Sequence, residues 1–544
     1  MQPTSVSLAH ALHPTRGQAS QLWQSFLQSA DPHSKVLHIP TSQKIVYEAI
    51  SAPEKASAEV QCLLFAVYFA GVNVLPPEAV RSILDKDKQK AMDGFRQGLD
   101  ICLAAANVFG NPTIMGLQAL SIFLVSSLTP SDLGVLLNRL LFLHKMMFRN
   151  QNHGRSFWVL SGVAMRVAHF LGLHRDPSSF PGVSPFEAEL RRRLWWHLVT
   201  LEGRTAEDSG LALNTMEAAT NTRFPLVVDD SALDPAMEAL PTPPPEGVWT
   251  EMTLAVILFD CAATLRQLFS VASPVSEGPL IGDSRPRIIP SEARRREIVE
   301  ALRSRIESRI SGCHHAIPLQ RLTMKLGRML VLKAEFVTRQ AWQQMRDSGD
   351  DPNTTKEPSA RRGLPTSRAY LTDAVTILEL YYTLETDELL PNFRVMSESF
   401  PQTHALLYVL WHLWVRPDED DGIDPERAWR AAEYAYSVEE VRIQRRVQAG
   451  TDADPGPKWR VLKALKDKLM RARQMKSHQK STESETAASG PESKARAEEG
   501  IDNEVVMSSD GTALDIDQMF NDELGWGGEF MDWKSLAEDL AVHH

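Results

Sequence analysis

Apolar residues recur at positions i, i+3, i+4 and i+7 along most of this 544-residue chain. Because an α-helix turns once every 3.6 residues, this spacing gathers the apolar side chains on one face of each helix. The sequence contains no series of short segments in which apolar and polar residues alternate between hairpin turns, the pattern of antiparallel strands. The periodicity therefore predicts an all-α fold with a large multi-helix domain.

The most apolar stretch, residues 114–128 (IMGLQALSIFLVSSL), is the best candidate for a membrane span. It is shorter than the roughly 20 residues that a helix needs to cross a bilayer, so it predicts a buried core helix instead. Residues 1–18 lack the charged start and apolar region of a secretory signal peptide. Together with 43% hydrophobic and 23% charged residues, these features predict a soluble intracellular protein that does not bind a membrane.

The residue types that carry most enzyme and metal chemistry are scattered along the sequence. No Cys-x-x-Cys pair occurs, which argues against a zinc finger or a disulfide framework and favours buried thiols at Cys62, Cys102, Cys261 and Cys313. His169 and His174 are five residues apart and fall on different helix faces, and the Gly-Cys-His-His run at 312–315 is typical of a polar cap or loop. Phosphate-binding and hydrolase motifs are absent from the sequence. We predict that the chain is not an enzyme and has no catalytic residue, metal or cofactor.

Charge divides the chain into three parts. Residues 481–544 contain sixteen acidic and three basic residues, whereas the rest of the chain is close to neutral. Immediately before this tail, residues 458–480 hold nine Lys or Arg and one Asp. From about residue 477, serine, glutamate and alanine dominate, a composition that does not support a packed core. The predicted organisation is a disordered N-terminus at 1–20, a helical domain at 21–447, a basic helix at 458–480, a disordered linker at 481–509 and an acidic, aromatic-rich segment at 510–544.

The segment EAELRRRLWWHLVTLEG, residues 187–203, tests whether the chain presents a basic surface to nucleic acid. Helical spacing predicts one apolar stripe, formed by Leu190, Leu194, Leu198 and Leu201. The three arginines at 191–193 then project around the other sides of the helix, where Glu187, Glu189 and Glu202 can pair with them. A nucleic-acid-binding helix would place its basic residues outward together with exposed aromatic residues. We therefore interpret the segment as structural scaffold.

A second informative helix lies upstream, at residues 156–177. Its predicted apolar face consists of Phe157, Leu160, Ala164, Val167 and Leu171. Gly172 is placed to end this helix, and Pro177 prevents its extension. At the helix end, His174 and Arg175 complement the negative end of the helix dipole.

Three strings of residues, in this order, resemble the fungal-specific transcription factor domain, the helical middle homology region of fungal zinc-cluster regulators. The first string matches at Gly162, Ala164, Arg166, Ala168, Leu171, Gly172, Leu173, His174, Arg175 and Asp176. The second string matches at Glu189, Arg191, Arg192, Arg193, Trp195 and Trp196. The third string matches at Thr222, Arg223, Pro225, Asp229 and Asp230. Residues 30–41 and 117–125 extend the resemblance to about residues 20–440, and its most specific part is 154–236.

The resemblance implies a helical regulatory domain of a nuclear transcription regulator, in which the matched residues have structural roles. Family members normally carry six clustered cysteines that bind two zinc ions and enter the DNA major groove, and this sequence contains no such cluster. A second departure follows the double tryptophan: the family commonly has a Gly-Arg-Pro-like turn where this chain reads DSGLALN at 208–214. Two explanations are open: the protein is a regulator without its own zinc-cluster DNA reader, or this sequence lacks its true N-terminus. In the first case it would contact DNA weakly or indirectly, as a homodimer or a heterodimer with a DNA-binding regulator.

The basic segment at 458–480 has two interpretations. Its apolar residues Trp459, Leu462, Leu465 and Leu469 predict a helix packed on the domain. Its cations resemble a loose nuclear-import signal, for which the candidate residues are Lys468, Arg471, Arg473 and Lys476. The run of arginines at 294–296 is a second candidate for import.

The acidic tail contains two short segments with helical spacing of large apolar residues. These residues are Met519, Phe520, Leu524, Trp526, Phe530, Trp533, Leu536 and Leu540. Isolated helices of this length are marginal in water, and a surrounding acidic charge keeps the aromatic residues solvated. This composition is typical of an activation segment that folds when its apolar face enters a coactivator groove. The alternative is a final helix that docks on the protein's own domain.

Three functions from different classes follow from these patterns. The first is a nuclear transcription regulator that acts through its helical domain and acidic tail. The second is a ligand-sensing or dimerising module without direct transcriptional output. The third, and the least supported by the motifs, is a helical enzyme.

Overall fold

The structure is a computed structural model of the whole chain. It describes residues 9–127, 153–209, 220–270, 292–348, 368–415, 425–448, 459–460, 462–471 and 473–474. Every regular element within these ranges is a helix, and they contain no β-strand, so the predicted all-α fold is confirmed. The predicted linker and acidic segment at 481–544 lie outside the described residues.

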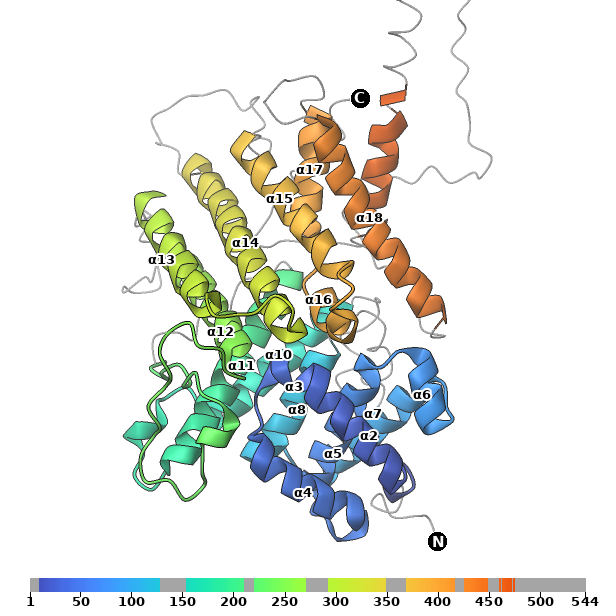
Figure 1. Ribbon diagram of the computed structural model, residues 1–544, viewed down its shortest axis with the longest axis vertical. Coiled ribbons are helices and arrows are strands. Elements are labelled where there is room, and N and C mark those ends of the chain that lie inside the picture. Colours follow the sequence, from blue (N-terminus) through green and yellow to red (C-terminus); the bar gives the residue numbers. More distant parts are fainter. Residues whose placement is uncertain are drawn as a thin grey trace, which may run out of the picture.

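The N-terminal helices form the lower half of the molecule (Figure 1). In chain order they are α2 (Arg16–Ser25), the π-helical turn η1 (Phe26–Ala30), α3 (Asp31–Ser34), α4 (Ile39–Ser51), the 3₁₀ turn η2 (Pro53–Lys55), α5 (Ala58–Val74), α6 (Pro77–Leu84), α7 (Lys88–Ala105) and α8 (Ile114–Ser126). Helix α5 is buried on all sides from Gln61 to Asn73, and it packs against α2, α7 and α8. An apolar helix of this kind has no solvent face to present, so the amphipathic helices surround it.

Helices α10 to α12 connect the two halves. Helix α10 (His153–Phe170) packs on α11 (Pro185–Ser209), and α11 packs in turn on α8 and on α12 (Thr253–Ser270). The 3₁₀ turns η4 (Pro177–Ser179) and η6 (Asp230–Ala232) lie in the connections before and after α11. Because α11 contacts helices on both sides, its side chains sit at the centre of the fold.

The C-terminal helices stand roughly side by side in the upper half of Figure 1. They are α13 (Glu292–Ile310), α14 (Pro318–Ser348), α15 (Arg368–Glu385), η7 (Pro391–Phe393), α16 (Arg394–Glu398), α17 (Thr403–Val415) and α18 (Pro425–Gln448). They enclose a second apolar core that is separate from the one around α5.

The most apolar stretch of the sequence forms α8, which is buried from Gly116 to Ser126. The hydroxyl of Thr113 accepts a hydrogen bond from the backbone N–H of Gly116 and caps the helix. The prediction of a buried core helix is therefore confirmed. In the part of the chain that the structure describes, no helix is both long enough and apolar enough to cross a membrane.

The N-terminal boundary of the fold differs from the sequence prediction. We predicted disorder at 1–20, but α2 begins at Arg16, and Ala9 and Ala19 are buried. The side chains of Thr15 and Gln18 cap this helix reciprocally in a capping box. This Thr-x-x-Gln pattern is a helix-start signal in the sequence, and the predicted disorder is wrong from residue 9 onward.

The basic segment packs on the C-terminal core through its apolar stripe. Its described residues are helical, and Leu462, Leu465 and Leu469 are buried beside α17 and α18. The hydroxyl of Tyr436 donates a hydrogen bond to the carbonyl of Leu462 at 2.6 Å. The segment is thus part of the domain's core rather than a separate unit beyond residue 447.

Candidate functional site

The three matched strings meet around α11, beginning at the end of α10. Gly172 has a φ of +74°, a left-handed conformation that favours glycine. The N–H of Gly172 donates to the carbonyl of His169, and the N–H of Leu173 donates to that of Ala168, the two hydrogen bonds of a Schellman cap. The predicted helix end is therefore confirmed. This sharp turn directs residues 174–176 back toward α11.

Asp176, just after this turn, binds two arginines from different parts of the chain. Arg192 on α11 donates two hydrogen bonds to its carboxylate, at 3.0 and 2.9 Å. Arg223 donates from its backbone N–H at 3.0 Å and from its guanidinium at 3.1 Å, and Ser178 also donates. Burial alone would raise the pKa of Asp176, but the hydrogen bonds from Arg192, Arg223 and Ser178 hold that pKa well below its usual range.

A second buried cluster surrounds Arg193. Its guanidinium lies 2.6 Å from the carboxylate of Asp230 and 3.5 Å from that of Glu189. Asp230 also lies 3.4 Å from Lys35 and accepts a hydrogen bond from the backbone N–H of Ile39. Burial opposes ionisation of Asp230, yet the neighbouring Arg193 and Lys35 hold its pKa below the usual value.

Lys35 joins this cluster to the N-terminal helices. Its ammonium lies 3.1 Å from the carboxylate of Asp31 and 3.4 Å from that of Glu251. Lys35 and Asp31 are almost fully buried. Burial raises the pKa of Asp31 to about 6, although Lys35 acts in the opposite direction. Segments that are about 200 residues apart in the sequence are therefore held together by charge pairs.

The structure corrects the predicted orientation of the arginines on α11. Arg191 follows the prediction, with an ion pair to Glu187 one turn away and 21% of its side chain exposed. The predicted partner Glu189 also lies 3.5 Å from Arg193. Arg192 and Arg193 are buried, and their main carboxylate partners, Asp176 and Asp230, come from outside the helix. The segment at 187–203 therefore serves as scaffold because Arg192 and Arg193 are buried in ion pairs, and not because its arginines face the solvent.

The two tryptophans of the motif occupy different environments. Trp195 is buried, and its ring meets that of His169 edge to face at 5.4 Å. Trp196 donates from its indole N–H to the carbonyl of Arg223 at 2.9 Å and stacks on Phe224. Pro225 is buried in the same connection.

Three of the remaining motif residues lie away from the charge clusters. His174 stacks on His169 with ring centroids 4.8 Å apart, and burial lowers its pKa. Arg175 lies over the ring of Phe180. Arg166 is exposed on α10, one turn from Gly162, so the structure does not bring this pair into the clusters.

The chemistry of these clusters is structural. Because arginines hold the Asp176 carboxylate ionised, it cannot take up a proton near neutral pH as a general base must. Among the described residues no group of three or more His, Cys, Asp or Glu could hold a metal ion. Cys62, Cys102 and Cys261 are buried free thiols as predicted, and Cys313 is half-buried. Asp176 and Asp230 were matched without predicted partners, and Lys35 was not predicted, although it lies in the matched stretch at 30–41.

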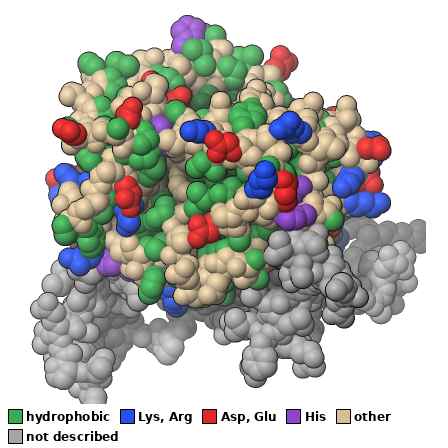
Figure 2. Space-filling model, turned by 90° about the horizontal axis from the view of Figure 1, so that it is seen from below, with side chains coloured by type: hydrophobic (Ala, Val, Ile, Leu, Met, Phe, Trp, Pro, Cys, Tyr) green, Lys and Arg blue, Asp and Glu red, His purple; other side chains and the backbone are tan. Residues whose placement is uncertain are grey.

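One face of the surface mixes charges of both signs. Figure 2 shows Lys, Arg, Asp and Glu interspersed with hydrophobic side chains on the side seen from below. A surface that binds nucleic acid usually gathers its basic residues into one patch. This face does not have that pattern.

Comparisons with known proteins agree with the matched strings. Residues 23–239 match the family described as the fungal specific transcription factor domain. Over 332 residues the chain is 27% identical to the aurofusarin cluster transcription factor aurR2 of Gibberella zeae, covering 61% of this chain and 44% of that protein. It is 31% identical to the pyriculol/pyriculariol biosynthesis cluster transcription factor 1 of Pyricularia oryzae, covering 47% of this chain and 31% of that protein. It is 24% identical to the transcriptional regulator AacuB of Aspergillus aculeatus, covering 80% of this chain and 53% of that protein. The chain thus spans about half or less of the length of these relatives.

Proposed function

We propose that the chain is a nuclear transcription regulator that acts through its acidic tail and through residues 23–239, which match the fungal specific transcription factor domain. The observation that carries the proposal is the match itself, whose most specific residues form the buried charge clusters around α11. The relatives described above are named as transcription factors or transcriptional regulators.

The proposed output is carried by the acidic segment at 510–544. Its aromatic and aliphatic residues recur with helical spacing between acidic residues. Such a segment becomes ordered, and loses conformational entropy, only when it binds, so it suits transient contacts with coactivators. In this proposal the helical domain supplies a rigid scaffold, and the tail recruits the transcription machinery.

Contact with DNA is proposed to be weak or to depend on a partner. Sequence-specific recognition needs side chains at base edges, whereas contacts with phosphates alone are nonspecific and salt-sensitive. The two arginines of α11 that first suggested a basic surface are buried in ion pairs and cannot reach a duplex. A heterodimer with a DNA-binding regulator would supply side chains that reach base edges.

A reporter assay tests the proposed output. The full chain and residues 510–544 are each fused to an unrelated DNA-binding domain, and we expect both to activate the reporter. Replacing Phe530 and Trp533 by alanine in either fusion should remove most of the activity, because these residues supply the apolar face. The matched control, Asp522→Asn with Glu523→Gln, changes charge but not that face and should retain most activity.

Two results would overturn the proposal in different ways. Full activity of the double aromatic variant would refute the role of the apolar face. A well-expressed full-chain fusion without any activity would favour a regulatory module that has no transcriptional output of its own.

A further inference from the structure

The connection between η6 and α12 contains a proline-rich segment, residues 240–245 (LPTPPP), that forms no regular helix. Every residue of this segment is a proline or precedes one. Proline fixes its own φ near about −65°, and the residue before a proline is kept out of the α-helical region. These restraints favour a preformed polyproline II helix, which turns once every three residues.

The exposure of the side chains follows that period of three. Pro241 and Pro244 are half-buried, and so is Gly247, whereas the two positions that follow each of these prolines are exposed. One edge of the helix therefore rests on the domain, and two edges face outward. The outward surface, which we call the proline ridge, consists of Leu240, Thr242, Pro243, Pro245 and Val248.

Both ends of the proline ridge are held on the domain. Before it, Asp234 accepts hydrogen bonds from the N–H of Ala236 at 2.7 Å and from that of Met237 at 3.0 Å, which closes a turn. After it, Gly247 has a φ of +88°, and its carbonyl oxygen lies so close to Gly312 that a side chain at Gly312 would collide with it. The ridge is therefore presented from two fixed points.

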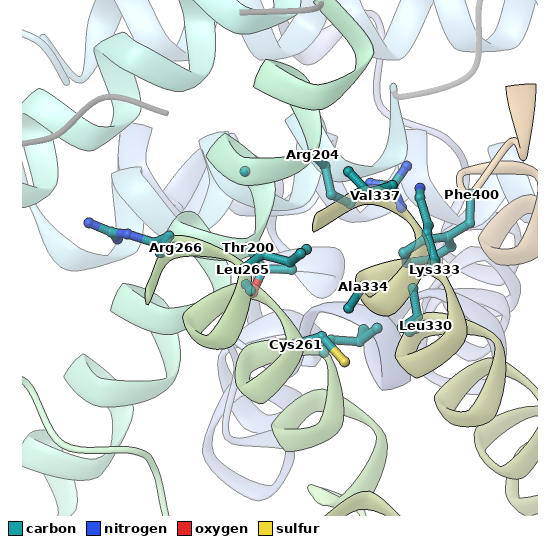
Figure 3. Close-up of a pocket in the computed structure, with 13 residues that line it drawn as sticks. Thr200, Arg204, Cys261, Leu265, Arg266, Leu330, Lys333, Ala334, Val337 and Phe400 are labelled. Carbon is teal, nitrogen blue, oxygen red and sulfur yellow. The ribbon is translucent and has the colours of Figure 1, made fainter. Parts of the chain in front are cut away.

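A ridge of this kind fits a groove on another protein better than it holds a small molecule. Small-molecule sites are concave, and the pocket between α11, α12 and α14 is of that form (Figure 3). None of the residues that line this pocket belongs to residues 240–248. A preformed polyproline II helix instead loses little conformational entropy when it enters a groove lined by aromatic side chains.

The chemistry of the proline ridge restricts the kind of groove that it fits. Because proline has no N–H group, the ridge offers mainly carbonyl acceptors, which the indole N–H of tryptophan and the O–H of tyrosine can satisfy. Glu238 and Glu246 are exposed on either side of it, and the sequence contains no Lys or Arg at 224–265. A groove with an acidic rim, which selects a cation in its ligand, therefore does not fit.

We propose that the proline ridge is a docking site for a protein domain that binds polyproline II helices. The groove of this domain would be lined by tryptophan and tyrosine and would have Lys or Arg at its rim. Pro243 and Pro245 would pack against the aromatic rings, and Glu238 and Glu246 would pair with the rim. The proposal goes beyond the function proposed above, because the ridge follows the matched residues 23–239 and needs neither the acidic tail nor DNA.

Binding of the purified full chain to an array of purified SH3, WW and EVH1 domains, which recognise polyproline II helices, tests the proposal. We expect one or more domains with a basic rim to bind the chain. Pro243→Ala with Pro245→Ala should weaken this binding by about tenfold or more, because both rings are lost and the helix becomes less rigid. The matched control, Pro181→Ala with Pro235→Ala, replaces two exposed prolines elsewhere and should leave the affinity unchanged.

Two further measurements test the charge and the segment itself. Glu238→Lys with Glu246→Lys should weaken binding, most clearly at low salt, because the rim then faces charges of its own sign. A synthetic peptide of residues 238–248 should displace the full chain from the bound domain. The same peptide with Pro243→Ala and Pro245→Ala should need about tenfold higher concentration, and this comparison does not require a variant chain to fold.

Several results would overturn the proposal. It is wrong if no domain of the array binds the full chain, or if only domains with an acidic rim do. It is also wrong if the proline variant binds as tightly as its control, if the glutamate variant binds more tightly than the wild type, or if the peptide displaces nothing. None of these measurements uses transcriptional output, so their failure would leave the reporter test of the proposed function unaffected.

Discussion

Neighbouring arginines on α11 should differ sharply in their contribution to stability. Arg191 and Arg193 are two residues apart in one helix, and each faces at least one carboxylate. Arg193 has no exposed side-chain surface, whereas Arg191 is 21% exposed and its partner Glu187 is 45% exposed. We predict that Arg193→Met strongly destabilises the protein and that Arg191→Met has little effect.

The expected loss of unfolding free energy in each variant depends on which carboxylates lose their arginine partner and on how deeply those carboxylates are buried. Without Arg193, the buried Asp230 loses its shortest ion pair, at 2.6 Å, and keeps Lys35 at 3.4 Å as its remaining cation. The fully buried Glu189 keeps Arg192 as its nearest cation, at the longer distance of 3.9 Å. Leaving a buried charge without its partner costs about 3–5 kcal/mol of unfolding free energy. An exposed pair such as Arg191 with Glu187 contributes about 0–1 kcal/mol, because water screens both charges. Methionine preserves most of the apolar volume of arginine, so the comparison isolates the charge.

Urea denaturation of the purified variants, followed by circular dichroism at 222 nm, measures the difference. A slope of about 1–3 kcal/mol per molar urea is usual for small proteins, and the slope rises with size. With a slope of about 3 kcal/mol per molar urea, a loss of 3–5 kcal/mol lowers the urea midpoint by about 1–1.7 M, and a steeper slope makes this shift smaller. Arg191→Met, made in the same helix with the same side chain, is the matched control.

A double-mutant cycle identifies the partner. If Arg193 acts through Asp230, the effects of Arg193→Met and Asp230→Asn will not add, because the second substitution removes the carboxylate that the first leaves unpaired. The reasoning is refuted if Arg193→Met is as stable as Arg191→Met, or if the two cluster substitutions are fully additive.

Two further predictions concern buried rings. Burial lowers the pKa of His33 to about 3 and that of His197 to about 4. Below pH 6.5 these groups take up protons in the unfolded chain but not in the folded one, so each lowers the unfolding free energy by about 1.4 kcal/mol per pH unit. Asp31 offsets the effect of one of these histidines on the unfolding free energy between about pH 6 and 4, because its raised pKa acts in the opposite direction. Unfolding midpoints measured from pH 7.5 to 5 should fall less steeply in His197→Gln than in the wild type. Equal slopes in the two proteins would contradict this prediction. Trp195→Ala should lower the unfolding free energy by about 3–5 kcal/mol, and Trp196→Ala should lower it less, since only Trp195 of the two is buried. Equal losses of thermal stability in the two variants would contradict this difference in burial.

Local patterns predicted the helices well. The stripe on α11 is confirmed at Leu194, Leu198 and Leu201, which are buried. The end of α10 at Gly172 is confirmed by its left-handed conformation. Both features depend on residues within a few positions of each other, and helical periodicity and cap chemistry act over that distance.

The partners of the buried arginines could not be predicted in this way. Arg192 binds a carboxylate 16 residues away, and Arg193 binds one 37 residues away. Helix geometry relates only residues three or four positions apart, so it offered Glu187, Glu189 and Glu202 as partners and assigned the arginines to the solvent side. Glu189 does pair with Arg193, but the shorter contact of Arg193 is with Asp230. Pairing between separate segments depends on how helices pack, which the spacing within one helix does not record.

The structure also changes the interpretation of the two predicted import signals, the run at 294–296 and the basic segment at 458–480. In the run at 294–296, Arg295 is fully buried and pairs with Glu292 and Glu335, so that run cannot present three cations to a receptor. On the basic segment, Lys468 lies over the ring of Trp414 at 5.2 Å, and Arg473 lies over Trp429 and pairs with Glu426. Lys476 lies outside the described residues.

The contacts that Lys468 and Arg473 make with the domain are weak enough for contacts with an import receptor to replace them. An exposed cation–π contact contributes about 0.5–1 kcal/mol and an exposed ion pair about 0–1 kcal/mol. We therefore predict that replacing Arg471, Arg473 and Lys476 together by glutamine lowers the nuclear fraction of a fluorescent full-chain fusion. Glu426→Gln, which frees Arg473 from its ion pair, should maintain or raise that fraction. A control that replaces Lys55, Lys86 and Lys90 by glutamine removes the same charge from exposed positions elsewhere. If both triple variants are folded and equally nuclear, the basic segment is not the import signal, and its cations serve only to hold it on α17 and α18.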